Sequence, residues 1–261
     1  MEISIYEKVT TLIAVAAFAQ PWVIQLCRKF FKKAKITFIP SGKIKLFYNR
    51  SGAYVQIGGV VESKNQPVVI KDISAKIIRE CDRAELKMNW HSFTVPVYQN
   101  VVGNIVTTSE MARPFKVQAD DLSSVFVEFA NVDASYLDQL SELHNTLIAA
   151  AKTIAAPTMP LEKAREDFKK TAQYQSVKEL LLESFYWKVS SYILQISICY
   201  GESFVEKFSY KFSLDESEIT EFKRDIETAM ECAMDNQYGQ SPAFYYPLKD
   251  YVETRNTHAN T

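Results

Sequence analysis

The residues most able to do chemistry in this chain are three histidines, at positions 91, 144 and 258, which stand far apart. His91 follows Trp90 on a predicted strand, where it could meet Asp72 or Asp82 across a sheet and form an acid–base pair. A lone histidine without a partnered nucleophile specifies no role, so a surface position is the favoured interpretation. His144 falls in a predicted helix rich in leucine and alanine, where a helix-surface position is expected.

Sequence motifs of catalytic, nucleotide-binding and metal sites are missing. The chain contains no GxSxG, Walker, GxGxxG, HExxH or CxxC pattern, and only 7 of its 261 residues are glycines. Its four cysteines, at positions 27, 81, 199 and 232, are expected to be reduced thiols. Cys27, beside a basic cluster, is the position where reversible acylation is chemically possible. We therefore assign no catalytic, cofactor-binding or metal-binding residue.

An uncharged stretch of nineteen residues, 9–27, lies near the start of the chain. A helix of this length spans about 28 Å, close to the hydrocarbon thickness of a bilayer. A basic cluster follows the stretch, and no acidic residue occurs between Glu7 and Glu62. Because lysine and arginine mark the cytoplasmic flank, the sequence predicts a single-pass helix in the inner (plasma) membrane. Its amino terminus would lie outside, and the rest of the chain would be cytoplasmic.

The residues expected at the membrane interface combine cations with large aromatic rings. They are Trp22, Arg28, Lys29, Phe30, Phe31, Lys32, Lys33 and Lys35. Each cation would be attracted to anionic head groups by about 1 kcal/mol. Basic and aromatic residues over 28–50 could instead bind single-stranded nucleic acid. Membrane topology explains them more simply, and with a net charge of −1 we expect no nucleic-acid partner.

Two alternatives to a spanning helix remain. Residues 17–19 (Ala-Phe-Ala) resemble a signal-peptidase site, and cleavage there would give an exported protein, although the basic cluster that follows opposes export. The stretch could also form a non-spanning amphipathic helix of a soluble protein.

The region 36–133 alternates between apolar and polar residues in about seven short strands. Residues 40–42 (Pro-Ser-Gly) mark the start of this domain, and residues 44–48 and 54–62 form a predicted hairpin. Within the second strand, residues 58–59 (Gly-Gly) predict a bulge or a close approach of backbones. Short strands without intervening helices predict an antiparallel β-sandwich of immunoglobulin-like architecture.

Helical periodicity follows over 134–155 and 161–184, which predicts a helical hairpin inserted into the sandwich. Strand alternation then returns in a hairpin over 192–212, expected to join the sandwich because an isolated hairpin is only marginally stable. A final helix is predicted to begin with a capping box formed by Ser213 and Glu216.

The sequence thus predicts an α+β protein with one amino-terminal transmembrane helix. The predicted parts are a membrane anchor with its basic flank (1–35), a β-sandwich (36–133), a helical hairpin insertion (134–184), a hairpin and C-terminal helix that complete the sandwich (185–251) and a disordered tail (252–261). The expected function is a non-catalytic binding or assembly module with a protein partner or a second copy bound through helices 134–184. A hydrolase whose site is assembled from distant residues is the alternative.

Overall fold

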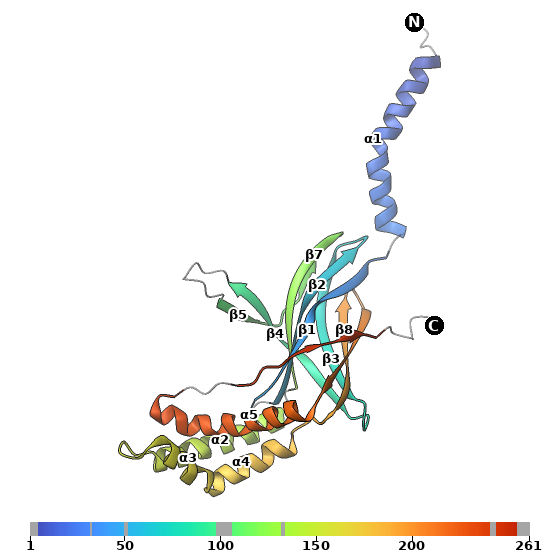
Figure 1. Cartoon of the computed structure of the whole chain (residues 1–261). Coiled ribbons are helices and arrows are strands. Elements are labelled where there is room, and N and C mark those ends of the chain that lie inside the picture. Colours follow the sequence, from blue (N-terminus) through green and yellow to red (C-terminus); the bar gives the residue numbers. More distant parts are fainter. Residues whose placement is uncertain are drawn as a thin grey trace.

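The computed structural model describes residues 5–31, 33–49, 52–97, 106–131, 134–240 and 244–254. A long amino-terminal helix, α1, projects from one end of a curled β-sheet, and further helices cover the opposite end (Figure 1). The elements are α1 (Ile5–Phe31), β1 (Lys35–Asn49), β2 (Gly52–Lys64), β3 (Val68–Arg79), β4 (Glu85–Val97), β5 (Val106–Met111), β6 (Phe115–Val117), β7 (Asp121–Ala130), α2 (Ala134–Ile154), α3 (Leu161–Lys169), α4 (Ala172–Glu183), β8 (Ser190–Tyr200), β9 (Phe204–Leu214), α5 (Glu216–Asp235), a 3-10 turn (Asn236–Tyr238), β10 (Leu248–Asp250) and β11 (Val252–Glu253). The fold is therefore α+β, as predicted.

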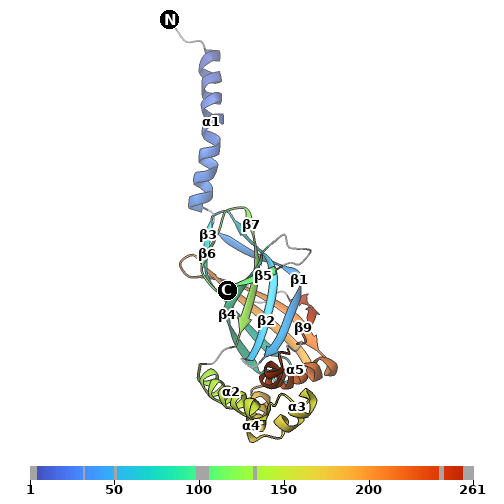
Figure 2. The same ribbon diagram turned by 90° about the vertical axis from the view of Figure 1, so that its left-hand side faces the viewer.

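The eleven strands in the described ranges form one sheet. Its order is β10-β1-β2-β7-β4-β3-β8-β9-β11, with β5 paired to β4 and β6 to β3. Neighbouring strands are antiparallel, and the sheet curls until it is nearly barrel-shaped (Figure 2). The predicted immunoglobulin-like sandwich of two sheets is therefore not confirmed. Alternation shows that a strand has one buried face, but a long twisted strand can bury that face inside its own curled sheet.

The inner face of the sheet forms the core. In β8, the alternate residues Tyr192, Leu194, Ile196, Ile198 and Tyr200 are buried, and the residues between them are partly exposed. The predicted hairpin over 192–212 is confirmed as β8 and β9, and it joins the same sheet beside β3. β3 is a central strand of the sheet, because it pairs with β4 and β6 on one side and with β8 on the other.

Two short C-terminal strands bridge the seam of the barrel between β1 and β9. β10 pairs with β1, and β11 pairs with β9. Aromatic rings also meet across this seam, with Phe38 of β1 lying 6.0 Å from Phe208 and 6.4 Å from Tyr210 of β9. The strands β10 and β11 near the end of the chain therefore close the barrel between β1 and β9.

The segment 40–42 lies inside β1 and does not precede the domain. The register with β2 shifts between Pro40 and Ile44, so the Pro-Ser-Gly sequence forms a bulge. At the glycine pair of β2, where the sequence predicts a bulge or a close approach of backbones, the nearest neighbours are mostly aromatic side chains. A Cβ at Gly58 would lie 2.5 Å from the ring of Phe126, and one at Gly59 would lie 2.6 Å from the ring of Phe38. Any larger side chain would overlap these rings.

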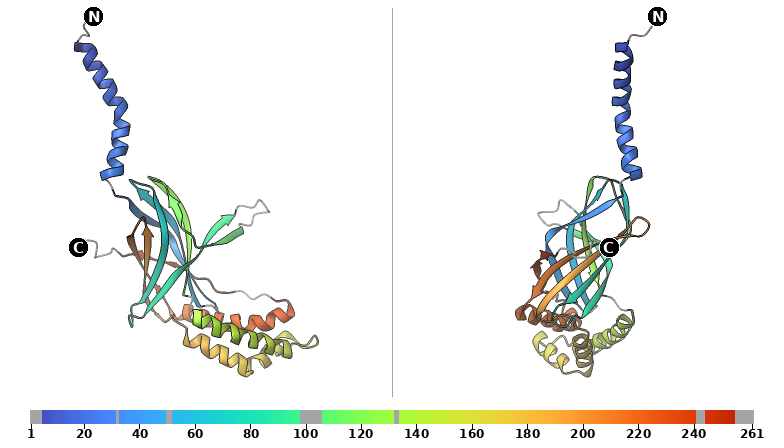
Figure 3. Two further views of the ribbon diagram at one scale, coloured as in Figure 1. Left: turned by 180° about the vertical axis from the view of Figure 1, so that it is seen from behind. Right: turned by 90° about the vertical axis from the view of Figure 1, so that its right-hand side faces the viewer.

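The helices α2 to α5 seal the end of the barrel opposite α1 (Figure 3). The first predicted helix matches α2 (Ala134–Ile154), but the second is broken into α3 and α4. Thr171 causes the break, because it leaves the helical conformation and its hydroxyl accepts a hydrogen bond from the backbone N–H of Tyr174. Phe168 and Leu181, on α3 and α4, are buried in the core of this same chain.

The capping box of the last helix lies two residues later than predicted. The side chain of Asp215 accepts from the backbone N–H of Glu218, and the Glu218 carboxylate accepts from the N–H of Asp215. Ser213 instead lies in β9, which ends at Leu214, and it pairs with Ser191. Both pairs, Ser213 with Glu216 and Asp215 with Glu218, have the spacing of a capping box. Because β9 extends to Leu214, the helix begins at the later pair.

α1 is a 27-residue helix that contains Pro21. Among the helices that the structure describes, none combines the length and the apolar character needed to cross a membrane. The predicted transmembrane helix is therefore not found.

Candidate binding pocket at the open end of the barrel

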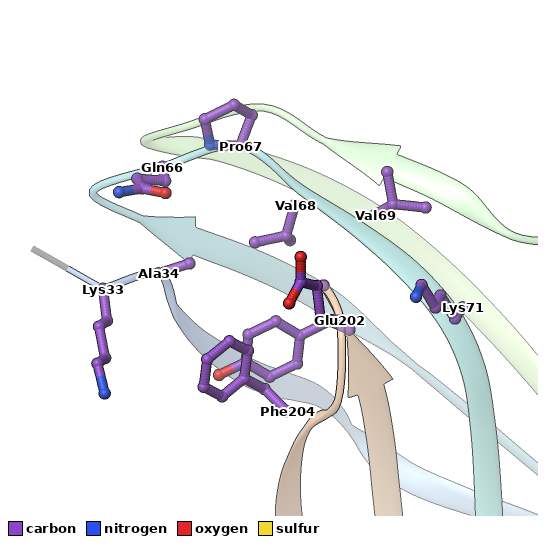
Figure 4. Close-up of a pocket in the computed structure, with 11 residues that line it drawn as sticks. Lys33, Ala34, Gln66, Pro67, Val68, Val69, Lys71, Glu202 and Phe204 are labelled. Atoms are coloured by element: carbon purple, nitrogen blue, oxygen red, sulfur yellow. The ribbon is translucent and has the colours of Figure 1, made fainter. Parts of the chain in front are cut away.

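A cavity of about 580 Å³ lies at the end of the barrel where α1 joins β1 (Figure 4). This volume is within the range of roughly 300–1,000 Å³ that is typical of small-molecule sites. Three segments far apart in the chain line it: residues 33–34 before β1, residues 66–71 from the β2–β3 turn and β3, and residues 200–204 from the β8–β9 turn.

The β3 wall contributes Val68, Val69 and Lys71. β3 begins with regular alternation, so Val68 is buried and Val69 is 44% exposed. The pairing with β8 then shifts between Ile70 and Asp72, which makes Lys71 the extra residue of a bulge. A bulge changes the direction of a side chain. The bulge thus accounts for a lysine next to apolar residues on the pocket wall.

The turn between β8 and β9, which adjoins β3, forms a second wall. The rings of Tyr200 and Phe204 stack with centroids 5.7 Å apart and an interplanar angle of 28°. Gly201 makes the turn possible with a φ of 60°, and its N–H donates to the carbonyl of Val69 at 3.1 Å. Glu202 lies between these residues and lines the pocket (Figure 4).

Burial of Tyr200 raises the pKa of its phenol, and the nearby Glu206 carboxylate raises it further. The Tyr200 hydroxyl donates to that carboxylate at 3.4 Å. The phenol is therefore a neutral part of the wall.

Hydrogen bonds fix the third side of the pocket. The side-chain amide of Asn65 donates to the carbonyl of Lys33 at 3.0 Å, which ties the start of β1 to the β2–β3 turn. The hydroxyl of the fully buried Ser63 donates to the carbonyl of Gln66 at 2.6 Å, and the N–H of Asp120 donates to the backbone carbonyl of Ser63 at 2.7 Å. The open end is thus a preformed structure in which several loops are joined to one another.

The pocket combines an apolar wall with three charged side chains. Val68, Val69 and Phe204 supply the apolar surface, and Lys33, Lys71 and Glu202 supply the charges. Across the described ranges, no other charged group forms an ion pair with any of these three. Such an arrangement can bind an amphiphile, with its hydrocarbon part against the wall and its charged part near the lysines.

Few of the predicted interface residues reach this pocket. Trp22 lies on α1 and is 68% exposed, and residues 28–31 form the last turn of α1. Lys32 lies outside the described residues. Lys33 lines the pocket, and Lys35, the first residue of β1, is exposed beside it.

The possible acid–base group around His91 is not assembled. His91 is exposed, and its ring lies 5.8 Å from the ring of Tyr54. Asp82 instead forms a bidentate ion pair with Arg79, with two distances of 2.8 Å, which holds the pKa of that carboxyl well below its usual value. Asp72 lies on β3 opposite Cys199. His258 lies outside the described residues.

Among the described residues, Cys81, Cys199 and Cys232 take part in no disulfide bond. In the part of the chain that the structure describes, no three side chains of histidine, cysteine, aspartate or glutamate come together as a metal site.

Sequence reasoning missed the pocket residues other than Lys33. Two signals pointed to them. Lys71 and Asp72 are consecutive polar residues that interrupt an otherwise regular alternation, which indicates a bulge. Gly201-Glu202-Ser203 lies in the middle of the predicted hairpin over 192–212, where a turn is expected, but the segment that it faces is more than 100 residues away in the chain.

Comparisons of the chain with protein family models, with curated proteins and with solved structures gave no match.

Proposed function

We propose that this protein is a membrane-attached, non-catalytic binding module. In this proposal α1 is inserted into the inner (plasma) membrane, with its amino terminus outside, and the barrel lies on the cytoplasmic face. The observation that carries the proposal is a long helix with exposed apolar side chains, joined directly to the open end of the barrel.

The exposed apolar side chains of α1 point in many directions. At 3.6 residues per turn, they cover about two thirds of the helix circumference. They are Tyr6, Val9, Leu12, Ile13, Val15, Phe18, Trp22, Val23, Ile24 and Leu26, all at least 47% exposed. A helix lying on a membrane surface, or against one protein face, needs a single apolar stripe, whereas a helix that is apolar on most sides is suited to insertion.

Two residues of α1 that are not typical of an apolar helix, Thr10 and Pro21, are compatible with a membrane. The hydroxyl of Thr10 donates to the carbonyl of Tyr6 at 2.8 Å, within the helix. A hydroxyl that is bonded to its own backbone has less need of water, and proline is tolerated in membrane helices for similar reasons. Thr10 and Pro21 therefore do not oppose insertion.

The link between α1 and the barrel is short. α1 ends at Phe31 and β1 begins at Lys35, so four residue steps separate them, which span at most about 14 Å. If the end of α1 lies at the membrane surface, the pocket lies near that surface too. The basic residues 28–35 would then meet anionic head groups on the cytoplasmic side.

A protein partner or a second copy bound through the helices 134–184 stays part of the proposal. The buried residues of α2 to α4, such as Phe168, Tyr174 and Leu181, already pack within this chain. Association would therefore use their outer surfaces. Light scattering of the detergent-solubilised full-length chain tests this, and a monomer at high concentration would contradict it.

Fractionation of cells that express the full-length chain tests the attachment. We expect the protein in the membrane fraction after washing at high salt and at alkaline pH. The double substitution Val15→Asp with Phe18→Asp should release it, because an aspartate at the centre of a membrane helix costs about 3 kcal/mol. The control Val252→Asp changes an apolar residue that is 70% exposed on β11, and it should leave the protein in the membrane fraction. Recovery of the unmodified protein in the soluble fraction at low salt would refute the proposal.

The side of the membrane is tested separately with an external protease. When intact cells without an outer envelope are treated with the protease, the barrel should stay undigested as long as the cells retain their cytosolic markers. Digestion of the barrel under these conditions would place it outside, as cleavage after Ala19 would.

A further inference from the structure

We propose that the pocket at the open end of the barrel holds one acyl chain of a phospholipid whose head group carries a single negative charge. This inference rests on the proposed function, because the lipid is taken from the bilayer that holds α1.

The size and the walls of the pocket suit a hydrocarbon chain. Pockets of roughly 300–1,000 Å³ bury most of the surface of a small ligand. The cavity offers about 580 Å³. Its walls are formed by Pro67, Val68, Val69, Tyr200 and Phe204, and transfer of each methylene from water to such a surface is favourable by about 0.8 kcal/mol.

The charges at the pocket select an anionic head group. Lys33 and Lys71 supply two positive charges and Glu202 supplies one negative charge, so the lining has a net charge of +1. A phosphodiester with one negative charge complements this net charge. Glu202 would accept hydrogen bonds from hydroxyl groups of the head group, and it would oppose head groups with more negative charge.

The rim of the barrel favours contact with lipid. Three apolar side chains near the starts of β7 and β9, Leu122, Phe204 and Val205, are exposed, and Phe204 also lines the pocket. Val69 is exposed at the opening and also lines the pocket. An acyl chain could therefore move from the bilayer into the pocket along an apolar path.

The test uses full-length protein in vesicles of phosphatidylglycerol and phosphatidylcholine in equal amounts. The phosphatidylglycerol carries a diazirine near the end of one acyl chain. After illumination and digestion with trypsin, mass spectrometry locates the label. We expect label in the α1 peptide 9–28 and also in the two pocket peptides, 65–71 and 189–207.

Val69→Glu is the decisive variant. It places a carboxylate on the pocket wall and should reduce the label in both pocket peptides several-fold, while the label in peptide 9–28 stays unchanged. The matched control is Leu122→Glu, since Leu122 is also an exposed apolar residue at the rim (61%, against 44% for Val69) but does not line the pocket. The control should keep the label in the pocket peptides. Equal thermal melting of both variants shows that the barrel is intact.

The same experiment separates the two proposals. Label in peptide 9–28 alone would overturn the acyl-chain site and leave membrane attachment standing. Failure of the protein to float with the vesicles would refute the attachment and the inference together.

Lipid selectivity is measured by repeating the experiment in the same vesicles with the diazirine on phosphatidylcholine in place of phosphatidylglycerol. We expect labelled phosphatidylcholine to give less label in the pocket peptides than labelled phosphatidylglycerol. This preference for phosphatidylglycerol should disappear in the double variant Lys33→Gln with Lys71→Gln. It should persist in the control double variant Lys35→Gln with Lys116→Gln. Equal labelling by both lipids in the unmodified protein would overturn the assignment of an anionic head group. Labelling by a free diazirine fatty acid, without labelling by either phospholipid, would overturn the phospholipid as the ligand.

Discussion

A buried carboxylate holds the C-terminal segment against the last helix. Asp225 on α5 is 1% exposed, and the backbone N–H of Tyr245 donates to its two oxygens at 3.1 and 3.0 Å. Burial raises the pKa of Asp225 to about 6, although the Tyr245 N–H and the nearby Arg224 lower it. At neutral pH Asp225 is therefore mostly ionised, although its buried position favours the neutral acid.

This carboxylate predicts a pH-dependent effect of Asp225→Asn. The pKa is raised from 3.8 to about 6 on folding, so the stability that the neutral acid contributes is present below about pH 4 and lost as the pH rises through 6. Asparagine stays neutral and can still accept from Tyr245. We expect the variant to be more stable than the unmodified protein at pH 7.5, by up to about 3 kcal/mol, and equally stable at pH 4. Urea unfolding at both pH values measures the difference.

The control for this prediction is Asp250→Asn. Asp250 is 85% exposed and pairs with Lys43 at 3.4 Å, so its replacement should change little at either pH. The same stability gain from Asp225→Asn at pH 4 and pH 7.5 would contradict the titration of Asp225.

The two neighbouring glycines of β2 should differ in their tolerance of alanine. A Cβ at Gly59 would lie 2.7 Å from the backbone oxygen of Ile39 and 2.6 Å from the buried ring of Phe38. A Cβ at Gly58 would lie 2.5 Å from the ring of Phe126, which is 40% exposed, and 2.9 Å from the hydroxyl oxygen of Ser41, so its nearest neighbours are side-chain atoms. We expect Gly59→Ala to lower the free energy of unfolding by about 1–3 kcal/mol and Gly58→Ala to lower it less, as measured by urea unfolding. The reverse order would show that Phe126 is the more rigid neighbour.

Among the elements, α5 connects the barrel to its helical cover. It follows β9 directly, and Ile226 and Met230 on its apolar face are buried against the core. Its other side pairs with α3 and α4, through Arg165 to Asp235 at 2.8 Å and Lys178 to Glu227 at 2.7 Å. The start of α5 therefore fixes the position of the whole helical layer.

The capping box at this start gives the prediction for the element. Asp215→Ala removes the acceptor for the N–H of Glu218 and should lower the melting temperature by roughly 2–4 °C, measured by circular dichroism. The hydrogen bonds from Ser217 and Glu218 lower the pKa of Asp215, so the loss should be present at neutral pH and shrink as the pH falls below 4. Ser213→Ala should have a smaller effect, because Ser213 lies within β9 and does not cap the helix. A larger effect of Ser213→Ala would favour the capping box expected from the sequence.

For the whole molecule, closure of the barrel depends on the C-terminal segment. Besides the pairing of β10 and β11, Lys249 forms an ion pair with Glu218 at 2.6 Å, and the hydroxyl of Tyr251 accepts from the N–H of Gly42 at 3.1 Å. The pairing of β10 with β1 and the hydrogen bond between Tyr251 and Gly42 join segments about 200 residues apart in the chain. Loss of the C-terminal segment should therefore separate β1 from β9 at the seam.

Deletion of residues 244–261 should open this seam. We expect faster hydrogen exchange of backbone amides in β1 and β9, which lose their outer partners, and unchanged exchange in β3, which is paired on both sides. The control deletes only residues 255–261 and should change neither strand. Unchanged exchange in β1 after the longer deletion would show that β1 and β9 hold together without the segment.

Local patterns in the sequence were sufficient for most of the elements. The hairpin over 192–212, the central strand β3 and the helix α2 follow from residue periodicity, because burial of one face imposes a period of two on a strand and 3.6 on a helix. The close approach at Gly58 and Gly59 followed from residue type. The break at Thr171 and the exact start of α5 did not, since each depends on which of several polar side chains caps the helix.

The tertiary structure alone decided how the strands are arranged and where the pocket lies. Alternation says that a strand has a buried face, but not whether that face meets a second sheet or the inside of its own. The pocket joins Lys33, Lys71 and Glu202, which come from three segments that share no local pattern. Only curling of the sheet and closure of its seam bring such segments together, because both result from pairing between residues distant in the chain.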